Sequence, residues 1–298
     1  MTDAAEPENL RLTLTRRSNA AVDFVQALWA SRWGRRSIIA AGFLALLYAA
    51  FWFAFARGLP DASALLKYQP PLPTNIRSVD GTPVYSYARE RRVQLSYDEF
   101  PPLLVNAYLA AEDRTFFSHG GVDYPGVVRA LFTNLTRSGR PVGASTITQQ
   151  VAKNLLIGND VTYSRKVKEA LLAYRIEAAL SKKQILELYL NQIALGRNAF
   201  GVQSAALAYF GKDAKDLSLP EMAYLAILPK GPSNYRPERF YDKAMARRNW
   251  VLGEMLKNDF IDKAQHDAAV AKPLGTIPRV QLKDEVVGGY FKIGRAHV

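Results

Sequence analysis

The residue types needed for acid–base chemistry gather between Glu112 and Glu169. This stretch opens with EDRTFFSHGG, continues through GASTITQQ and closes with RKVKE. Two carboxylates therefore flank a turn of small polar residues and a set of cations. A carboxylate can take a proton from a hydroxyl, and fixed cations can hold a departing negative charge. These residue types predict transfer chemistry on a sugar that bears an anionic leaving group.

Glu112 is the candidate base. Apolar residues recur at helical spacing before it, which predicts an amphipathic helix that ends at Glu112. Phe116 and Phe117 follow closely, so we expect apolar surroundings that raise the pKa of the Glu112 carboxyl. A raised pKa suits a general base near neutral pH. The alternative is that Glu112 only caps its helix or pairs with Arg114.

The residues that follow Glu112 are expected to shape a turn. Asp113, Phe116 and His119 lead into the glycine pair Gly120-Gly121. The chain has three histidines, and no cluster of His, Asp and Glu has the spacing of metal ligands. We therefore predict no metal site here and interpret His119 as a structural, hydrogen-bonding residue.

A second helix is predicted to begin shortly after Gly143. Thr146 and Gln149 fit the capping-box pattern, and Ser145 is a competing cap. The start of a helix carries free amide donors, so it is a natural site for an anion. The alternative is a well-capped helix on the surface with no ligand.

Polar side chains continue along this helix. Gln150, Lys153 and Asn154 lie at i, i+3 and i+4, so we expect them to share one face. Lys153 would then add a point charge one turn beyond the helix start.

A third helix carries the second carboxylate, with Ser164 as its expected cap. Arg165, Lys168 and Glu169 fall on one face of this helix. Two interpretations stay open: the three residues surround an anionic group, or Glu169 and Arg165 form only an intrahelical ion pair. Such a pair stabilises a helix by roughly 0.2–0.5 kcal/mol.

An uncharged apolar stretch from Ser37 to Ala56 predicts a transmembrane helix. At about 1.5 Å of rise per residue, this stretch spans a hydrocarbon core of about 30 Å. Arginines crowd its N-terminal side, which places the N-terminus in the cytoplasm and the rest of the chain outside. The alternative, a cleaved signal peptide, is disfavoured because the run is too long and no A-x-A site closes it.

The remaining pattern divides the chain into five predicted regions. They are a cytoplasmic tail (1–36), the transmembrane helix (37–56), a linker with a β-hairpin around Asp80-Gly81 (57–100), a mainly helical domain (101–272) and the start of a further linker (273–298). We interpret residues 293–298 as an artefact of the gene model, because translation of a common sequencing adapter gives the same string.

Composition narrows the function classes. The formal net charge is +12, which favours nucleic acid, an anionic membrane surface or a phosphorylated substrate. Nucleic acid is disfavoured because the predicted topology places the basic domain outside the membrane. The chain has no cysteine, which excludes disulfides and cysteine–metal sites.

Five motifs in one order identify a family resemblance. EDRTFFSHGG, GASTITQQ, RKVKE, KKQILELYLN and YLAILPKGPSNYRP resemble the motifs of the peptidoglycan glycosyltransferases, glycosyltransferase family 51. Over residues 65–291 the chain is similar to the N-terminal half of a class A penicillin-binding protein. The resemblance implies a mainly α fold: a lysozyme-like head with a smaller membrane-facing lobe, a short N-terminal β-hairpin and one preceding transmembrane helix. No S-x-x-K or K-T-G motif is present, so the transpeptidase domain is missing.

The resemblance also implies a reaction and a set of roles. Lipid II would be polymerised into glycan strands by inverting transfer, with release of undecaprenyl diphosphate, on the outer, periplasmic face of the cytoplasmic (inner) membrane. Glu112 would deprotonate the acceptor 4-hydroxyl, and Glu169 would assist departure of the donor diphosphate. The implied donor contacts are Ser145, Gln150, Lys153, Arg165 and Lys168. Asp113, Phe116, His119 and Thr146 would be structural members of the motifs.

The same resemblance sets the expected ligands and partners. No cofactor is required, although a divalent cation can be accommodated at the diphosphate. The expected partners are lipid II, the nascent glycan strand, the inner membrane and other cell-wall synthesis proteins, with no nucleic acid.

Two positions depart from the family pattern, and two other functions stay open. Val161 stands where many members carry an arginine, and Arg236 stands where an asparagine is usual. A lytic enzyme that cleaves glycan strands would share this fold but would need no lysines beside a diphosphate. A membrane-anchored scaffold would need neither carboxylate.

Overall fold

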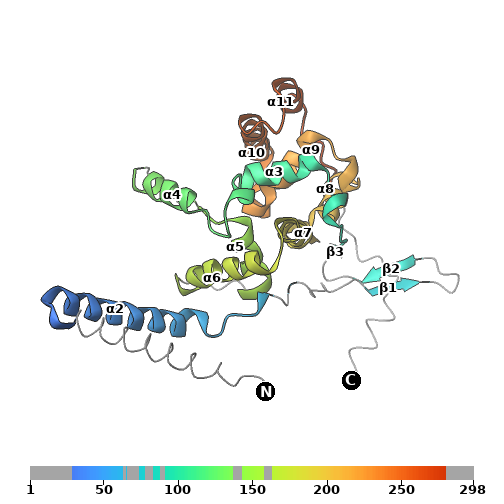
Figure 1. Ribbon diagram of the computed structural model, residues 1–298. Coiled ribbons are helices and arrows are strands. Elements are labelled where there is room, and N and C mark those ends of the chain that lie inside the picture. Colours follow the sequence, from blue (N-terminus) through green and yellow to red (C-terminus); the bar gives the residue numbers. More distant parts are fainter. Residues whose placement is uncertain are drawn as a thin grey trace, which may run out of the picture. The chain divides into compact units, whose positions relative to one another are not determined.

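The computed structural model describes residues 29–62, 65, 74–77, 83–87, 91–136, 143–157 and 163–279. The chain forms two compact units, residues 1–59 and residues 60–298. The mainly α-helical fold predicted from the sequence is confirmed (Figure 1).

The first unit contains the apolar helix α2 (Arg32–Phe51), which continues as a π-helical segment, Trp52–Ala56. Ser31 caps α2 by accepting a hydrogen bond from the Gly34 backbone N–H at 2.8 Å. The helix therefore begins before the predicted boundary at residue 37. Together the two segments make 25 residues, long and apolar enough to cross a membrane, and no residue of their most apolar 18-residue window is buried. The predicted tail up to residue 28 lies outside the described residues.

The second unit carries the candidate site. Its α-helices are α3 (Pro102–Glu112), α4 (Tyr124–Thr136), α5 (Ile147–Ala152), α6 (Tyr163–Ala179), α7 (Lys182–Gln192), α8 (Val202–Phe210), α9 (Leu219–Ile227), α10 (Pro237–Lys257) and α11 (Lys263–Val270). Shorter segments are η3 (Tyr97–Glu99), η4 (Phe116–Ser118), the π-helical η5 (Lys153–Ile157), η6 (Ala214–Asp216), η7 (Leu228–Lys230) and η8 (Pro232–Tyr235). Capping boxes begin α5, α7, α9 and α11, which explains where these helices start.

Two groups of helices form the core of this unit. Helices α3, α9 and α10 pack against one another, and α5 packs against both α6 and α7 (Figure 1). Tyr108 on α3 is fully buried, and its hydroxyl donates to the Leu225 carbonyl on α9 at 3.2 Å. The two groups meet where the end of α3 faces the start of α5, and this junction carries the candidate site.

The strands are few and short. β1 (Thr74–Arg77) and β2 (Pro83–Tyr87) pair antiparallel, which confirms the predicted hairpin, although its Asp80-Gly81 turn lies outside the described residues. A second sheet has the order β3-β5-β4, built from β3 (Arg91–Arg92), β4 (Ala194–Gly196) and β5 (Ala199–Phe200).

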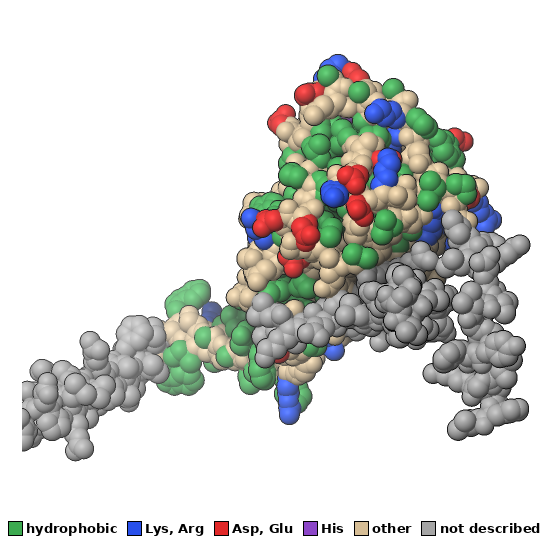
Figure 2. All heavy atoms as spheres, turned by 90° about the vertical axis from the view of Figure 1, so that its right-hand side faces the viewer, with side chains coloured by type: hydrophobic (Ala, Val, Ile, Leu, Met, Phe, Trp, Pro, Cys, Tyr) green, Lys and Arg blue, Asp and Glu red, His purple; other side chains and the backbone are tan. Residues whose placement is uncertain are grey.

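The segment after α11 remains attached to the domain. Arg248 on α10 is fully buried, and its guanidinium donates to the carbonyls of Val270, Lys272 and Pro273. Further along, the Ile277 backbone N–H donates to the Tyr209 carbonyl at 2.8 Å. The linker predicted to begin at residue 273 is therefore packed against the helices at least as far as Ile277. On the face shown in Figure 2, acidic, basic and hydrophobic side chains are interspersed.

Candidate active site

Glu112 is the last residue of α3, as the sequence predicts. The helix ends because Asp113 leaves the helical conformation, with φ −161°. The Asp113 carboxylate accepts a hydrogen bond from the Ile147 backbone N–H at 2.9 Å and lies 3.0 Å from His119 Nε2. The residue next to the candidate base therefore ties the end of α3 to the start of α5.

The start of α5 is fixed by Thr146. Its hydroxyl accepts from the Gln149 N–H at 3.2 Å, and the Gln149 side chain accepts from the Thr146 N–H at 3.0 Å. The Thr146 hydroxyl also donates to the Gly121 carbonyl at 2.6 Å. Thr146 rather than Ser145 is thus the cap, and it also binds the turn that follows Glu112.

Gly121 allows this turn to approach α6 closely. Its φ is +99°, and a Cβ atom built on it would lie 2.9 Å from the backbone carbonyl of Ala173. A side chain at this position would be strained and would collide with the helix that carries Glu169.

Phe116 and His119 connect the turn that follows Glu112 to Lys182 at the start of α7. Phe116 is fully buried, and the Lys182 ammonium lies 4.3 Å from the centroid of its ring. The same ammonium donates to the His119 carbonyl at 2.6 Å and to Glu177 at 2.7 Å. These contacts are of the structural kind expected for Phe116 and His119. Lys182, which belongs to the fourth motif, therefore contacts two residues of the first motif.

Gln150 contacts the candidate base rather than solvent. Its Nε2 donates to Glu112 Oε2 at 2.9 Å, across the junction between α5 and α3. Among the described residues, no ion pair joins Glu112 to Arg114. The alternative in which Glu112 pairs with Arg114 is therefore wrong. The other oxygen of the Glu112 carboxylate, Oε1, accepts no hydrogen bond from the described part of the chain.

The surroundings of Glu112 raise the pKa of its carboxyl, chiefly because burial disfavours the charged form. The hydrogen bond from Gln150 and the positive charges of Arg247 and Lys230 oppose this rise, while the neighbouring Asp113 adds to it. The expected direction is therefore confirmed. The pKa is raised because Glu112 is buried where the two helix groups meet, and the cations Arg247 on α10 and Lys230 on η7 limit the rise.

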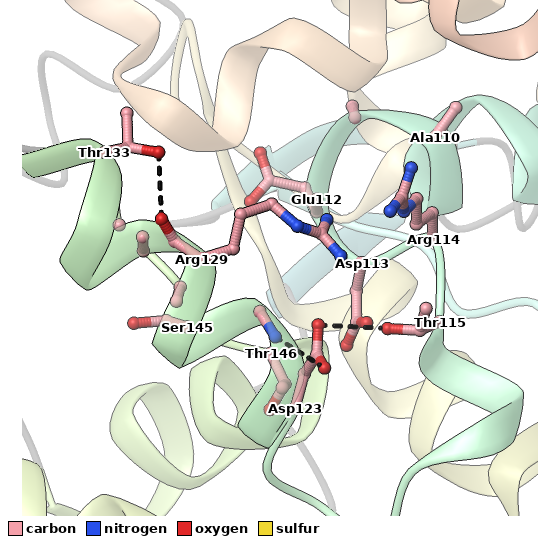
Figure 3. A pocket seen from close by; sticks show the side chains of 15 residues that line it. Ala110, Glu112, Asp113, Arg114, Thr115, Asp123, Arg129, Thr133, Ser145 and Thr146 are labelled. Carbon is pink, nitrogen blue, oxygen red and sulfur yellow. Dashed lines mark hydrogen bonds between the residues drawn. The ribbon is translucent and has the colours of Figure 1, made fainter. Parts of the chain in front are cut away.

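A pocket of about 230 Å³ opens beside Glu112. Its wall includes Glu112, Arg114, Arg129 on α4, and Ser145. Figure 3 shows Arg129 extending from α4 towards Glu112 and Asp113, while Arg114 lies on the other side of the pocket, beside Ala110. The pocket thus combines a carboxylate that can take a proton with two guanidinium groups that can hold negative charge.

The second carboxylate, Glu169, is 1% exposed and lies on α6. Arg165 Nη1 lies 2.7 Å from one of its oxygens, and Lys166 Nζ lies 2.5 Å from the other. Lys166 also donates to the Ser145 hydroxyl at 3.0 Å. The intrahelical pair with Arg165 is therefore present, but Lys166 extends it to the loop before α5. Helix α6 begins at Tyr163, so Ser164 lies inside the helix and is not its cap, contrary to the expectation.

Lys153 and Lys168 differ from these paired cations. Within the described part of the chain, neither ammonium forms an ion pair or a side-chain hydrogen bond. Lys153 begins the π-helical η5, whose wider turn changes the angular spacing assumed for a face shared by Gln150, Lys153 and Asn154. Gln150 points to Glu112, and Lys153 is left available to an external anion.

Sequence reasoning missed four residues at this site. Lys166 stands three residues before Glu169, a spacing that could have revealed it. Arg129 and Arg247 come from elements remote in sequence, so no local pattern points to them, whereas Lys230 lies in the fifth motif, YLAILPKGPSNYRP, but was given no role there. Arg236 is exposed at the start of α10, and Val161 lies outside the described residues. Across the described ranges, no three His, Cys, Asp or Glu side chains are grouped to hold a metal ion.

Comparison with known proteins fits this site. A family model described as Transglycosylase matches residues 80–256, so the chain belongs to the transglycosylase family. Penicillin-binding protein 1A of Rickettsia felis is 44% identical over 238 residues, 79% of this chain and 30% of that protein. The corresponding protein of Neisseria cinerea is 47% identical over 227 residues, 76% of this chain and 28% of that protein.

A solved structure of penicillin-binding protein 1A from Haemophilus influenzae is 26% identical, with a TM-score of 0.44, and covers 76% of this chain and 24% of that one. The chain spans 30% or less of the curated relatives given above. It contains the peptidoglycan glycosyltransferase region of a class A penicillin-binding protein, as the motif resemblance implied.

Proposed function

We propose that this domain polymerises lipid II into glycan strands by inverting transfer, with Glu112 as the general base. The proposal rests mainly on the Glu112 carboxyl, which is partly buried at a helix end and has a raised pKa. It accepts a hydrogen bond from Gln150 and lines a pocket. The acceptor 4-hydroxyl gives its proton to Glu112, and its oxygen forms a bond to C1 of the donor. The bond between C1 and the diphosphate oxygen breaks on the opposite face.

Glu169 and the cations around it are proposed to serve the donor. Arg165 and Lys166 are held by Glu169, and Lys166 reaches Ser145 at the loop before α5. Lys153 and Lys168 have no carboxylate partner among the described residues, so they can bind the two negative charges of a diphosphate without first breaking an ion pair. A divalent cation would add to this set only if the diphosphate brings it, and no step depends on one.

Incubation of the chain with labelled lipid II tests the proposed function. Polymer should form, and moenomycin, an inhibitor of this family, should stop it. Labelled glycan strands in a parallel reaction distinguish the alternatives. Consumption of strands with no use of lipid II would identify a lytic enzyme, and consumption of neither substrate would leave a scaffold.

Lys153→Ala is expected to weaken use of the donor without unfolding the domain. A lost charge-assisted contact costs about 1.5–3 kcal/mol, which corresponds to a rise in KM of roughly tenfold to a hundredfold. Lipid II kinetics and the melting temperature should be measured together. Lys257→Ala is the matched control, because among the described residues the exposed Lys257 ammonium on α10 pairs only with Glu254. An unchanged KM, or a large fall in melting temperature, would argue against a role at the diphosphate.

The membrane is proposed as a partner of both units. Helix α2 with its π-helical extension is long enough to span a bilayer. Helix α4 in the second unit exposes an apolar stripe at i, i+3, i+4, i+7, i+8 and i+11 spacing, formed by Tyr124, Val127, Val128, Leu131, Phe132 and Leu135. Such a stripe suits contact with lipid, where a polyprenyl substrate is found.

We expect the N-terminus in the cytoplasm and the catalytic domain on the outer face, because arginines precede the apolar helix. Protease added to spheroplasts should then digest the domain while an N-terminal tag stays protected until the membrane is permeabilised. A domain that resists digestion until permeabilisation would reverse the assigned orientation.

A further inference from the structure

We propose that Tyr189 is a positioning residue that orients the Gln150 amide so that its NH₂ group faces Glu112. This inference rests on the proposed function, in which Glu112 is the base. Tyr189 belongs to α7 and to the fourth sequence motif, KKQILELYLN.

Two consecutive hydrogen bonds connect side chains on three helices. The Tyr189 hydroxyl on α7 lies 3.4 Å from Gln150 Oε1 on α5. Gln150 Nε2 lies 2.9 Å from Glu112 Oε2 at the end of α3. Tyr189 is 1% exposed, so its hydroxyl cannot exchange its partner freely for water, while Gln150 is only partly buried.

The chemistry of the three groups fixes which of them donates and which accepts in each hydrogen bond. An ionised carboxylate only accepts hydrogen bonds, so the donor end of the Gln150 amide must face Glu112. Burial and the charge of Glu112 raise the pKa of Tyr189 well above its usual range, so its hydroxyl keeps its proton and donates. In the described part of the chain, this hydroxyl has no other hydrogen-bond partner. At 3.4 Å the contact is long, and its effect is to select one of two amide orientations.

Loss of the hydroxyl would remove that selection. An amide turned by 180° places its oxygen against the carboxylate, where two acceptors meet unless the carboxyl is protonated. The pKa of Glu112 would then rise, since the Gln150 hydrogen bond lowers it. The other ionisable groups that shift the pKa of Glu112 are Asp113, which follows α3, Lys230 on η7 and Arg247 on α10, and Tyr189→Phe alters none of them.

Tyr189→Phe tests the proposal, and Tyr108→Phe is its matched control. Both tyrosines are buried, and their rings pack edge to face with centroids 6.1 Å apart. The Tyr108 hydroxyl donates to the Leu225 carbonyl and does not contact Gln150. For Tyr189→Phe we expect kcat to fall roughly threefold to tenfold with KM little changed. The acidic limb of the rate–pH profile should move up by about half a pH unit to one pH unit. Tyr108→Phe should keep the parental limb.

A second measurement does not depend on the reaction. The Glu112 carboxyl carbon can be titrated by NMR, with its signal assigned by its loss in Glu112→Gln. We expect a higher pKa in Tyr189→Phe than in the parent and in Tyr108→Phe. Equal pKa values in all three proteins, or the same rise in both variants, would overturn the inference. If the parent does not use lipid II, the proposed function fails, and this titration still decides the role of Tyr189.

Discussion

The Glu112→Gln protein is expected to polymerise lipid II about 10²–10⁴-fold more slowly than the parent, the range that general-base catalysis contributes. Glutamine keeps the volume of glutamate, so the end of α3 and the tie from Asp113 to Ile147 should survive. It cannot accept a proton, so the acceptor hydroxyl stays a poor nucleophile. The melting temperature and the affinity for moenomycin should therefore remain close to those of the parent.

The pH dependence of the parent should report the same group. Glu112 must be ionised to act as a base, so the rate falls as the pH drops through its pKa. Burial raises that pKa above the usual value of a glutamate, so the loss of activity should begin at a higher pH than for an exposed carboxylate. The residual activity of Glu112→Gln should lack this acidic limb.

A surface carboxylate supplies the control for Glu112→Gln. Asp267 on α11 is exposed and pairs with Lys263, so Asp267→Asn should leave the rate unchanged. A Glu112→Gln rate within about threefold of the parent, far below the loss expected for a base, would remove Glu112 from the catalytic role.

Glu169→Gln is expected to be almost as severe, but through the donor. Removal of one partner from a buried ion pair costs about 3–5 kcal/mol, because the remaining charge is left without compensation. Here two cations lose their partner, and Lys166 loses the anchor that holds it near Ser145. Because these cations are proposed to hold the departing diphosphate, we also expect roughly a hundredfold loss in kcat/KM, about 2.7 kcal/mol of transition-state stabilisation.

Helix α6 offers a matched control for Glu169→Gln. Glu177 lies on the same helix, is largely buried and pairs with Lys182. Glu177→Gln therefore removes a buried, paired carboxylate without touching Arg165 or Lys166. Both variants should lose stability, but only Glu169→Gln should lose affinity for moenomycin. Equal losses of activity in the two variants would show that Glu169 matters for folding rather than for the donor.

Local patterns predicted the frame of the site. The helical spacing of apolar residues placed Glu112 at the end of α3, and the Thr146/Gln149 pair placed the start of α5. Both features depend on residues within one helical turn, so periodicity and capping chemistry reveal them. The apolar run that became α2 was recognised for the same reason.

Contacts between remote segments could not be predicted in this way. Arg247 and Lys230 influence Glu112 from elements more than a hundred residues further along the chain. Gln150 was assigned to a polar face shared with Lys153 and Asn154, because a regular helix was assumed where the structure is π-helical from Lys153 onwards. Its partner is Glu112, and that pairing depends on how α5 packs against the end of α3. Family motifs showed which residues matter but not what they touch.

The close approach of Gly121 to Ala173 couples the turn that follows Glu112 to the helix that carries Glu169. Gly121 belongs to the turn anchored beside Glu112, and Ala173 lies one helical turn beyond Glu169 on α6. At this point the turn that follows Glu112 and the helix that carries Glu169 meet backbone against backbone, with no flexible side chain between them. A side chain in place of Gly121 would therefore push the turn away from α6 and change how the two carboxylates are placed relative to each other.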